Sequence, residues 1–117
     1  MRHVVQTDEQ AWKAVTAENL KGYELKPEVI GGEYTDAYSA DLARVAPGGF
    51  SAAPVDSERH AFFILEGSGR ITIGNERFDV EPGAVVKVPR GIAHAVHNTG
   101  TASLVLLTIN EPPRKRT

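Results

Sequence analysis

The sequence predicts an all-β domain, an antiparallel sandwich or barrel, on three observations. Seven short strand-like segments recur after residue 34, turn residues rich in Gly and Pro separate them, and no helical periodicity of any length is present. Short strands at regular spacing with such turns between them are typical of sandwiches and barrels. The chain has 117 residues, which fits one domain, because chains of this size rarely support two separate cores.

The N-terminal third is expected to hold two short elements. Residues 7–15 predict a short helix, because Thr7 is a suitable N-cap, Gln10 follows three residues later, and Trp12 and Val15 share a helical face. The segment from Leu25 to Glu33 contains one Pro and two Gly. These residues interrupt long elements, so the segment predicts a short edge strand with a turn.

The remaining strands follow in order. They are expected at Ala37 to Ala46, Ala61 to Leu65, Arg70 to Ile73, Glu76 to Val80, Ala84 to Val88, Ala93 to His97 and Ser103 to Ile109. Pro47-Gly48-Gly49 is interpreted as the turn after the first of these strands. Gly74-Asn75 provides the turn chemistry of a two-residue hairpin between the third and fourth.

Composition excludes several classes of function. The net charge of −2 and the pI near 6.1 give no basic surface for nucleic acid or anionic membranes, and no apolar run is long enough to cross a bilayer. The absence of Cys excludes disulfides, thiolate metal ligands and thiol nucleophiles. The N-terminus has no apolar stretch of secretory length, so a cytoplasmic protein is expected.

One segment carries a motif beyond the strand pattern. It fits G-x5-P-x-G-x2-H-x3-N at every fixed position, with Gly83, Pro89, Gly91, His94 and Asn98. This segment resembles the second motif of the cupin superfamily. The glycines and the proline shape turns, since Pro fixes φ just before the strand, and they position the histidine.

The first cupin motif, G-x5-H-x-H-x3-E-x6-G, is present only in degenerate form. Its spacing holds from Gly48 to Gly67, but Pro54, Asp56 and His60 stand where the family has histidine, histidine and glutamate. The resemblance, to a small single-domain cupin, covers residues 34–109. It implies a small antiparallel jelly-roll barrel with its site inside, where the strands of the two motifs meet.

The residue types at these positions suit a divalent metal. Two histidines and one carboxylate are a known donor set for Fe, and imidazole also binds Zn, Ni and related ions. The predicted ligands are therefore Asp56, His60 and His94, and the predicted ion is Fe, Mn, Ni or Zn. Because Pro54 supplies no side-chain donor, a barrel without any metal ion is also possible. Asp56 is equally explained as a residue of a polar turn, and Glu58 is an alternative carboxylate.

Strand periodicity predicts which side chains face the cavity. Residues two apart share a face, which groups His60, Phe62 and Ile64, and likewise His94 and Val96. Pro54 is two residues from Asp56 and is expected to face the same cavity. His97 is expected in solvent. Arg44 meets an anionic ligand only if it faces inward, and an Arg at a strand end is more often solvated.

Two functions of different class follow. The first is a small-molecule enzyme of the cupin type with a divalent metal in the barrel, of oxygenase, isomerase or lyase chemistry, since the fold alone does not choose the reaction. The alternative is a metal-free barrel that binds or senses a small ligand. The resemblance also implies a homodimer. The expected organisation is an N-terminal extension over residues 1–33 that contributes to dimer formation, a barrel over 34–110 and a tail over 111–117.

Overall fold

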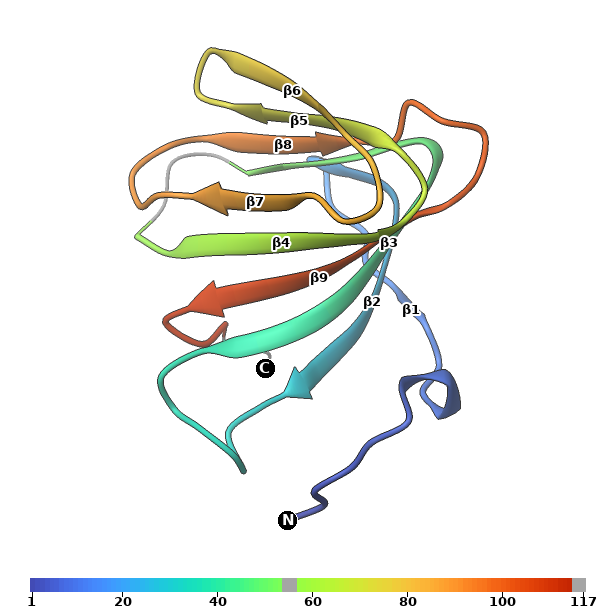
Figure 1. Ribbon diagram of the computed structural model, residues 1–117. Coiled ribbons are helices and arrows are strands. Elements are labelled where there is room, and N and C mark those ends of the chain that lie inside the picture. Colours follow the sequence, from blue (N-terminus) through green and yellow to red (C-terminus); the bar gives the residue numbers. More distant parts are fainter. Residues whose placement is uncertain (54–56, 115–117) are drawn as a thin grey trace.

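The computed structural model describes residues 1–53 and 57–114, and these residues form an antiparallel β-barrel (Figure 1). The prediction of an all-β jelly-roll fold is confirmed. The elements are η1 (Thr7–Glu9), β1 (Lys13–Ala14), β2 (Leu20–Ile30), β3 (Ser39–Ala53), β4 (Arg59–Glu66), β5 (Gly69–Ile73), β6 (Glu76–Val80), β7 (Val85–Val88), β8 (His94–His97) and β9 (Leu104–Glu111). Among the residues described, no helix has the length and apolar character needed to cross a membrane.

The longest strand, β3, joins the two halves of the barrel. The sheet order is β6-β5-β8-β3-β9-β4-β7, and β2 pairs with β3 off this path. The first part of β3, Ser39 to Val45, pairs with β9, whereas Phe50 to Ala53 pair with β8. A strand that changes partner along its length must bend, and this bend closes the sheet around an interior.

The bend lies at Pro47-Gly48-Gly49, for which the sequence predicts a turn after the strand. That prediction is wrong, since β3 continues through these residues with a shift in register against β2. Gly48 has φ of 77°, a conformation that favours glycine. A Cβ on Gly49 would lie 2.5 Å from the carbonyl oxygen of Lys21. Glycine therefore allows a bulge here rather than an end to the strand.

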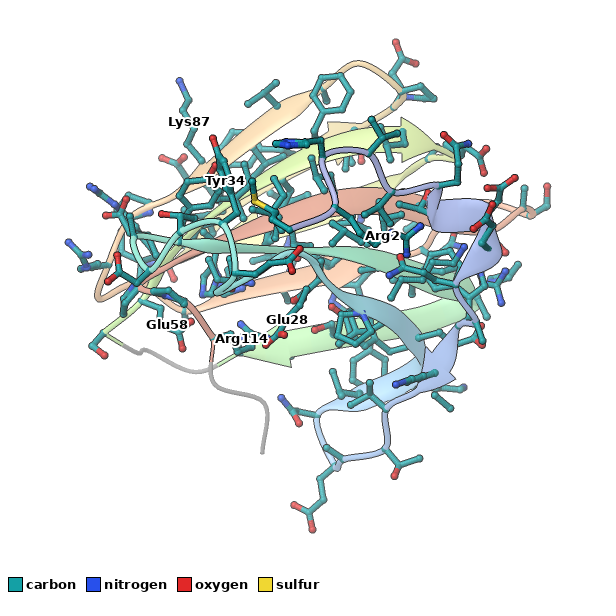
Figure 2. All side chains as sticks on the ribbon, turned by 90° about the horizontal axis from the view of Figure 1, so that it is seen from below. Arg2, Glu28, Tyr34, Glu58, Lys87 and Arg114 are labelled. Atoms are coloured by element: carbon teal, nitrogen blue, oxygen red, sulfur yellow. The ribbon has the colours of Figure 1, made fainter. Side chains whose placement is uncertain are left out.

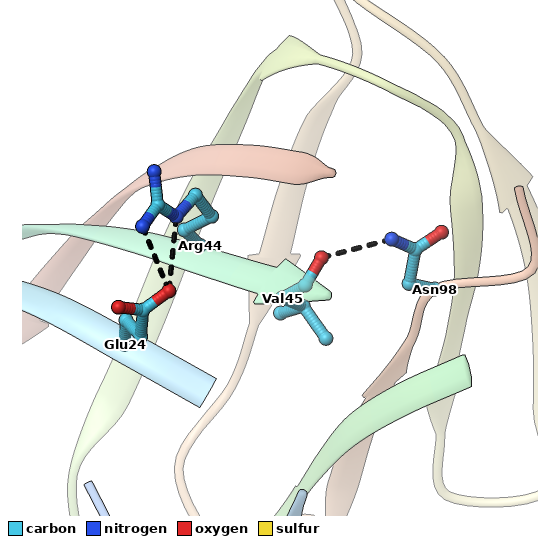
Figure 3. A network of polar contacts seen from close by, with 4 residues as sticks. All are labelled: Glu24, Arg44, Val45 and Asn98. Carbon is cyan, nitrogen blue, oxygen red and sulfur yellow. Dashed lines mark hydrogen bonds and ion pairs between the residues drawn. The ribbon is translucent and has the colours of Figure 1, made fainter. Parts of the chain in front are cut away.

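Asn98, the last residue of the second motif, bonds to β3 at this bend, and Figure 3 shows its contact with Val45. Its Nδ2 donates hydrogen bonds to the carbonyl oxygens of Val45 and Ala102, each at 2.8 Å. Its backbone N–H donates to the carbonyl oxygen of Gly49 at 3.0 Å. Asn98 is buried, and these bonds satisfy its amide, so its role is structural.

Alternation along the strands builds the core. In β9 the buried residues are Leu104, Leu106, Thr108 and Asn110, each two apart. The apolar members of such rows pack together in one cluster. It consists of Leu25, Ala43, Val45, Phe62, Ile64, Ile71, Val80, Val86, Val88, Val96, Leu104 and Leu106. The Gly74-Asn75 hairpin between β5 and β6 is confirmed, with Ile73 opposite Glu76.

The predicted helix over residues 7–15 is wrong. Only the 3-10 helix η1 forms, and Lys13 and Ala14 pair with β2 instead. A helix of nine residues forms too few hydrogen bonds to offset the unfavourable free energy of helix nucleation. Pairing with β2 instead gives these residues backbone hydrogen bonds with an existing strand. Trp12 lies under the Arg44 guanidinium, with Cζ 4.5 Å from the ring centre, a cation–π contact that holds this segment on the sheet.

β2 is longer than expected from the sequence and belongs to the same sheet. It runs over eleven residues, rather than starting at Leu25, and pairs with β3 along most of its length. Residues 1–33, expected to form an extension, thus contribute β1 and β2 to the sheet of their own chain.

Candidate functional site

Two histidines converge inside the barrel from strands that are not neighbours. His60 lies on β4 and is buried, with Phe62 and Ile64 buried on the same face. His94 begins β8, directly after the turn at Gly91, which has φ of 79°. The centroids of the two imidazole rings lie 4.9 Å apart. The strands of the two motifs therefore bring the predicted imidazoles together.

The aromatic ring of Phe62 lies beside both imidazoles. Its ring centroid is 5.7 Å from that of His94 and 6.3 Å from that of His60. His97 lies on the opposite face of β8, exposed and stacked on Phe50 at 5.8 Å, as its place in the strand predicts. The outer imidazole is thus separate from the inner pair.

A buried chain of hydrogen bonds orients His60. The Nδ1 atom of His60 lies 2.9 Å from Oδ1 of Asn110, and Nδ2 of Asn110 donates to the carboxylate of Asp41 at 3.3 Å. The same carboxylate accepts the backbone N–H of Glu28 at 2.8 Å. Asp41 is 1% exposed and Asn110 is 1% exposed, so these bonds form away from water.

The chain of hydrogen bonds also selects one tautomer of the neutral ring. An ionised carboxylate only accepts hydrogen bonds, so the amide of Asn110 turns its NH2 group toward Asp41 and its oxygen toward His60. The neutral ring of His60 must then carry its proton on Nδ1. The lone pair is left on Nε2, which is the form in which an imidazole binds a metal or accepts a proton.

The histidines line a cavity of about 160 Å³ in the barrel. Its described lining combines apolar side chains with a few polar groups, which is typical of small-molecule sites. It consists of Val15, Asn19, Leu20, Tyr23, Leu25, Ser51, Ala52, Ala53, His60, Phe62, His94, Val96, Leu106, Thr108, Asn110 and Arg114.

The other predicted site residues are placed as follows. Phe62 and Val96 line the cavity with the two histidines, and Ile64 packs in the core, fully buried. Pro54 and Asp56 lie outside the described residues. Across residues 1–53 and 57–114, no group of three or more His, Cys, Asp or Glu side chains could hold a metal ion. Within the described part of the chain, the candidate metal ligands in the cavity are therefore the imidazoles of His60 and His94.

Glu58, the alternative carboxylate ligand, and Arg44, the possible contact for an anionic ligand, do not line the cavity. Glu58 stands near Arg114 at the edge of the barrel, with Oε1 3.8 Å from the arginine Nε (Figure 2). Arg44 pairs with Glu24 at 2.8 Å (Figure 3) and packs on Trp12. Its guanidinium therefore contacts the N-terminal segment rather than a ligand in the barrel.

A larger open groove, of about 820 Å³, lies between residues 1–10 and the connection from β2 to β3. Arg2, Glu28 and Tyr34, labelled in Figure 2, are among its lining residues. The groove contains neither of the paired histidines. The paired histidines therefore line the smaller cavity and not this groove.

Comparison with known proteins agrees with this geometry. The model of the cupin domain family matches residues 41–110, which is more than half of the chain. The chain belongs to the cupin family. This cupin is 36% identical over 52 residues to an uncharacterized protein of Methanocaldococcus jannaschii, covering 44% of the chain and 42% of the relative. It is 36% identical over 66 residues to an uncharacterized protein of Streptomyces coelicolor, covering 52% and 63%. It thus spans less than two thirds of either relative.

Solved structures share the fold of this cupin. A predicted oxalate decarboxylase from Thermotoga maritima superposes with a TM-score of 0.83 at 21% identity, over 93% of the chain and 98% of that protein. The polyketide cyclase RemF from Streptomyces resistomycificus gives 0.85 at 19% identity, over 99% and 83%. KdgF from Halomonas gives 0.79 at 15% identity, over 93% and 94%. At these identities the likeness concerns the fold alone, because one barrel carries many functions.

Proposed function

We propose that this cupin holds a divalent metal ion in its barrel through His60 and His94 and that the ion and the cavity together bind a small molecule on which the protein acts. The observation that carries the proposal is the chain from Asp41 through Asn110 to His60. Metal-binding histidines typically donate their second ring N–H to such a partner, which fixes the tautomer and orients the ring.

The spacing of the two rings fits one shared ion. With metal–nitrogen bonds of about 2.1 Å, two imidazoles bound to one ion have centres about 4.5 to 5.2 Å apart for angles between octahedral and tetrahedral. The observed separation of 4.9 Å lies within this range. The two donors thus meet the spacing that the proposal requires.

Asp56 is the third donor in this proposal, on the strength of its place in the first motif. When bound, such an ion acts as a Lewis acid that polarises an oxygen atom of the ligand. His60 is held in its ligating form by Asn110, and Phe62 and Val96 give the ligand an apolar wall. Open positions on the ion would allow oxygenase, isomerase or lyase chemistry.

The test is metal content and affinity in the wild type and in Asn110→Ala. Protein purified without chelator should contain about one equivalent of Fe, Mn, Ni or Zn by elemental analysis. The Asn110→Ala variant should bind the same ion about 10- to 100-fold more weakly, because the orienting partner of His60 is lost. His97→Ala is the control, since that imidazole is exposed on the outer face of β8 and stacked on Phe50. Equal affinity in Asn110→Ala and wild type would contradict the orienting role.

A second candidate is a metal-free barrel that binds or senses a small ligand. The observation that favours it is that the described residues contain no group of three metal-ligating side chains. On this alternative, His60 and His94 are hydrogen-bonding contacts for the ligand. Wild-type protein that takes up no Fe, Mn, Ni or Zn in titration would support this function and contradict the first.

We also propose that two copies of the chain associate through the outer face of the sheet. Val85, Phe63, Leu107 and Leu42 stand opposite one another on β7, β4, β9 and β3 and form an apolar row. Val85 is 60% exposed and Phe63 is 41% exposed. An apolar row of this kind on one sheet can pack against its own copy in a two-fold arrangement.

Light scattering after size-exclusion chromatography tests the association. The wild type should have the mass of a dimer, and Phe63→Glu should be a monomer, because a charge would then be buried in the apolar row. Thr72→Glu, on the outward part of β5 and outside the row, is the control and should stay dimeric. A monomeric wild type would contradict the proposal.

A further inference from the structure

We propose that the ligand of the cavity is a small organic acid whose carboxylate is recognised by Arg114. This inference rests on the proposed function, because it concerns the same cavity. It adds the chemical class of the ligand. Arg114 is the one Lys or Arg in the described lining, and that lining contains no Asp or Glu. Arg114 is therefore the fixed charge that faces the described cavity, and an anion is the ligand complementary to it.

The position of Arg114 is set by the chain that follows β9. Its backbone N–H donates to Oγ of Ser39 at 3.0 Å, at the start of β3. This bond anchors the segment beside the barrel, where Figure 2 shows Arg114 next to Glu58. Because the anchor is a backbone bond, it does not depend on the identity of the side chain at 114.

The guanidinium has donors to offer a ligand. Its side chain is 35% exposed, and its ion pair with Glu58 runs through Nε at 3.8 Å. Arginine has five N–H donors in a planar fork, which matches the two oxygens of a carboxylate. A carboxylate bound there would engage the NH2 groups while Glu58 keeps the arginine at the edge of the barrel.

The rest of the cavity selects an organic acid over an inorganic anion. Phe62, Val96 and Leu106 line it with Leu25 and offer an apolar surface to a short carbon chain. The volume of about 160 Å³ corresponds to about five water molecules at 30 Å³ each. The geometry thus fits an acid of a few carbon atoms with its carboxylate at Arg114 and its body toward the histidines.

The test is calorimetric titration with butyrate and lactate, with butyramide and lactamide as neutral counterparts and inorganic phosphate as a second anion. Wild-type protein should bind at least one acid at least tenfold more tightly than its amide. Arg114→Gln should weaken that binding at least tenfold, and Arg114→Lys should recover part of it. The matched control is Arg90→Gln, expected within twofold of wild type, because Arg90 bonds to Glu111 and to the carbonyl oxygen of Ser57 and is not a lining residue.

The same titrations on metal-loaded and chelator-treated protein separate this inference from the proposed function. Acid binding that depends on Arg114 in chelator-treated protein supports the inference even if no metal binds. Metal uptake with no binding of either acid overturns the inference and leaves the proposed function standing. Equal binding in Arg114→Gln and wild type, or phosphate bound more tightly than both acids, would also overturn it.

Discussion

Replacing His94 with alanine is expected to weaken the binding of a divalent metal ion by on the order of 100-fold, and His60→Ala should have the same effect. Four-ligand zinc sites contribute about 10 to 16 kcal/mol, or about 3 kcal/mol per ligand, which is on the order of 100-fold in affinity. Each histidine supplies one of the two inner imidazoles, whose centres are 4.9 Å apart. Competition titration against a chromophoric chelator measures the loss.

His97→Ala is the matched control for this experiment. His97 lies on the same strand as His94 but is exposed on the outer face and stacked on Phe50. Its removal should leave the metal affinity within twofold of wild type. If His94→Ala and His97→Ala bind the metal equally well, the ion is not between the inner histidines.

The second large effect concerns stability. Asp41→Ala should lower the free energy of unfolding by about 2 to 6 kcal/mol, because each buried donor left without an acceptor costs about 1 to 3 kcal/mol. Two donors lose their acceptor, the backbone N–H of Glu28 and Nδ2 of Asn110. Urea denaturation measures the difference, since the midpoint shifts while the slope stays constant.

The same substitution at an exposed aspartate gives the comparison. The side chain of Asp79 is 82% exposed and pairs with Arg70 on the outer surface. Exposed ion pairs contribute about 0 to 1 kcal/mol, so Asp79→Ala should change the free energy of unfolding by less than about 1 kcal/mol. A change in Asp41→Ala as small as that in Asp79→Ala would show that the buried carboxylate is not needed to satisfy these donors.

The inward faces of the strands could be predicted from the sequence. A period of two fixes which residues share a face once the strand is recognised, and this placed Phe62 with His60 and Val96 with His94. The hairpin at Gly74-Asn75 could also be predicted, because a two-residue turn depends only on local residues.

Features that depend on partners distant in the sequence could not be predicted. Asn110 lies 69 positions from Asp41 and 50 from His60, and only the register of β9 against β3 and β4 brings the three together. Pro47-Gly48-Gly49 has the composition of a turn, and its use as a bulge inside β3 depends on the partners β8 and β9. Arg114 lines the cavity, and its backbone is anchored at Ser39, which is distant in the sequence.

The central claim is that the imidazoles of His60 and His94 bind one ion inside the barrel. The chain has 4 histidines, so a His3→Ala, His97→Ala background leaves only this pair. Pulsed electron paramagnetic resonance of that protein with one equivalent of Cu²⁺ counts the imidazoles on the ion. We predict two coordinated imidazoles, falling to one when His94→Ala is added. A spectrum with one or none in the His3→Ala, His97→Ala background would contradict the claim.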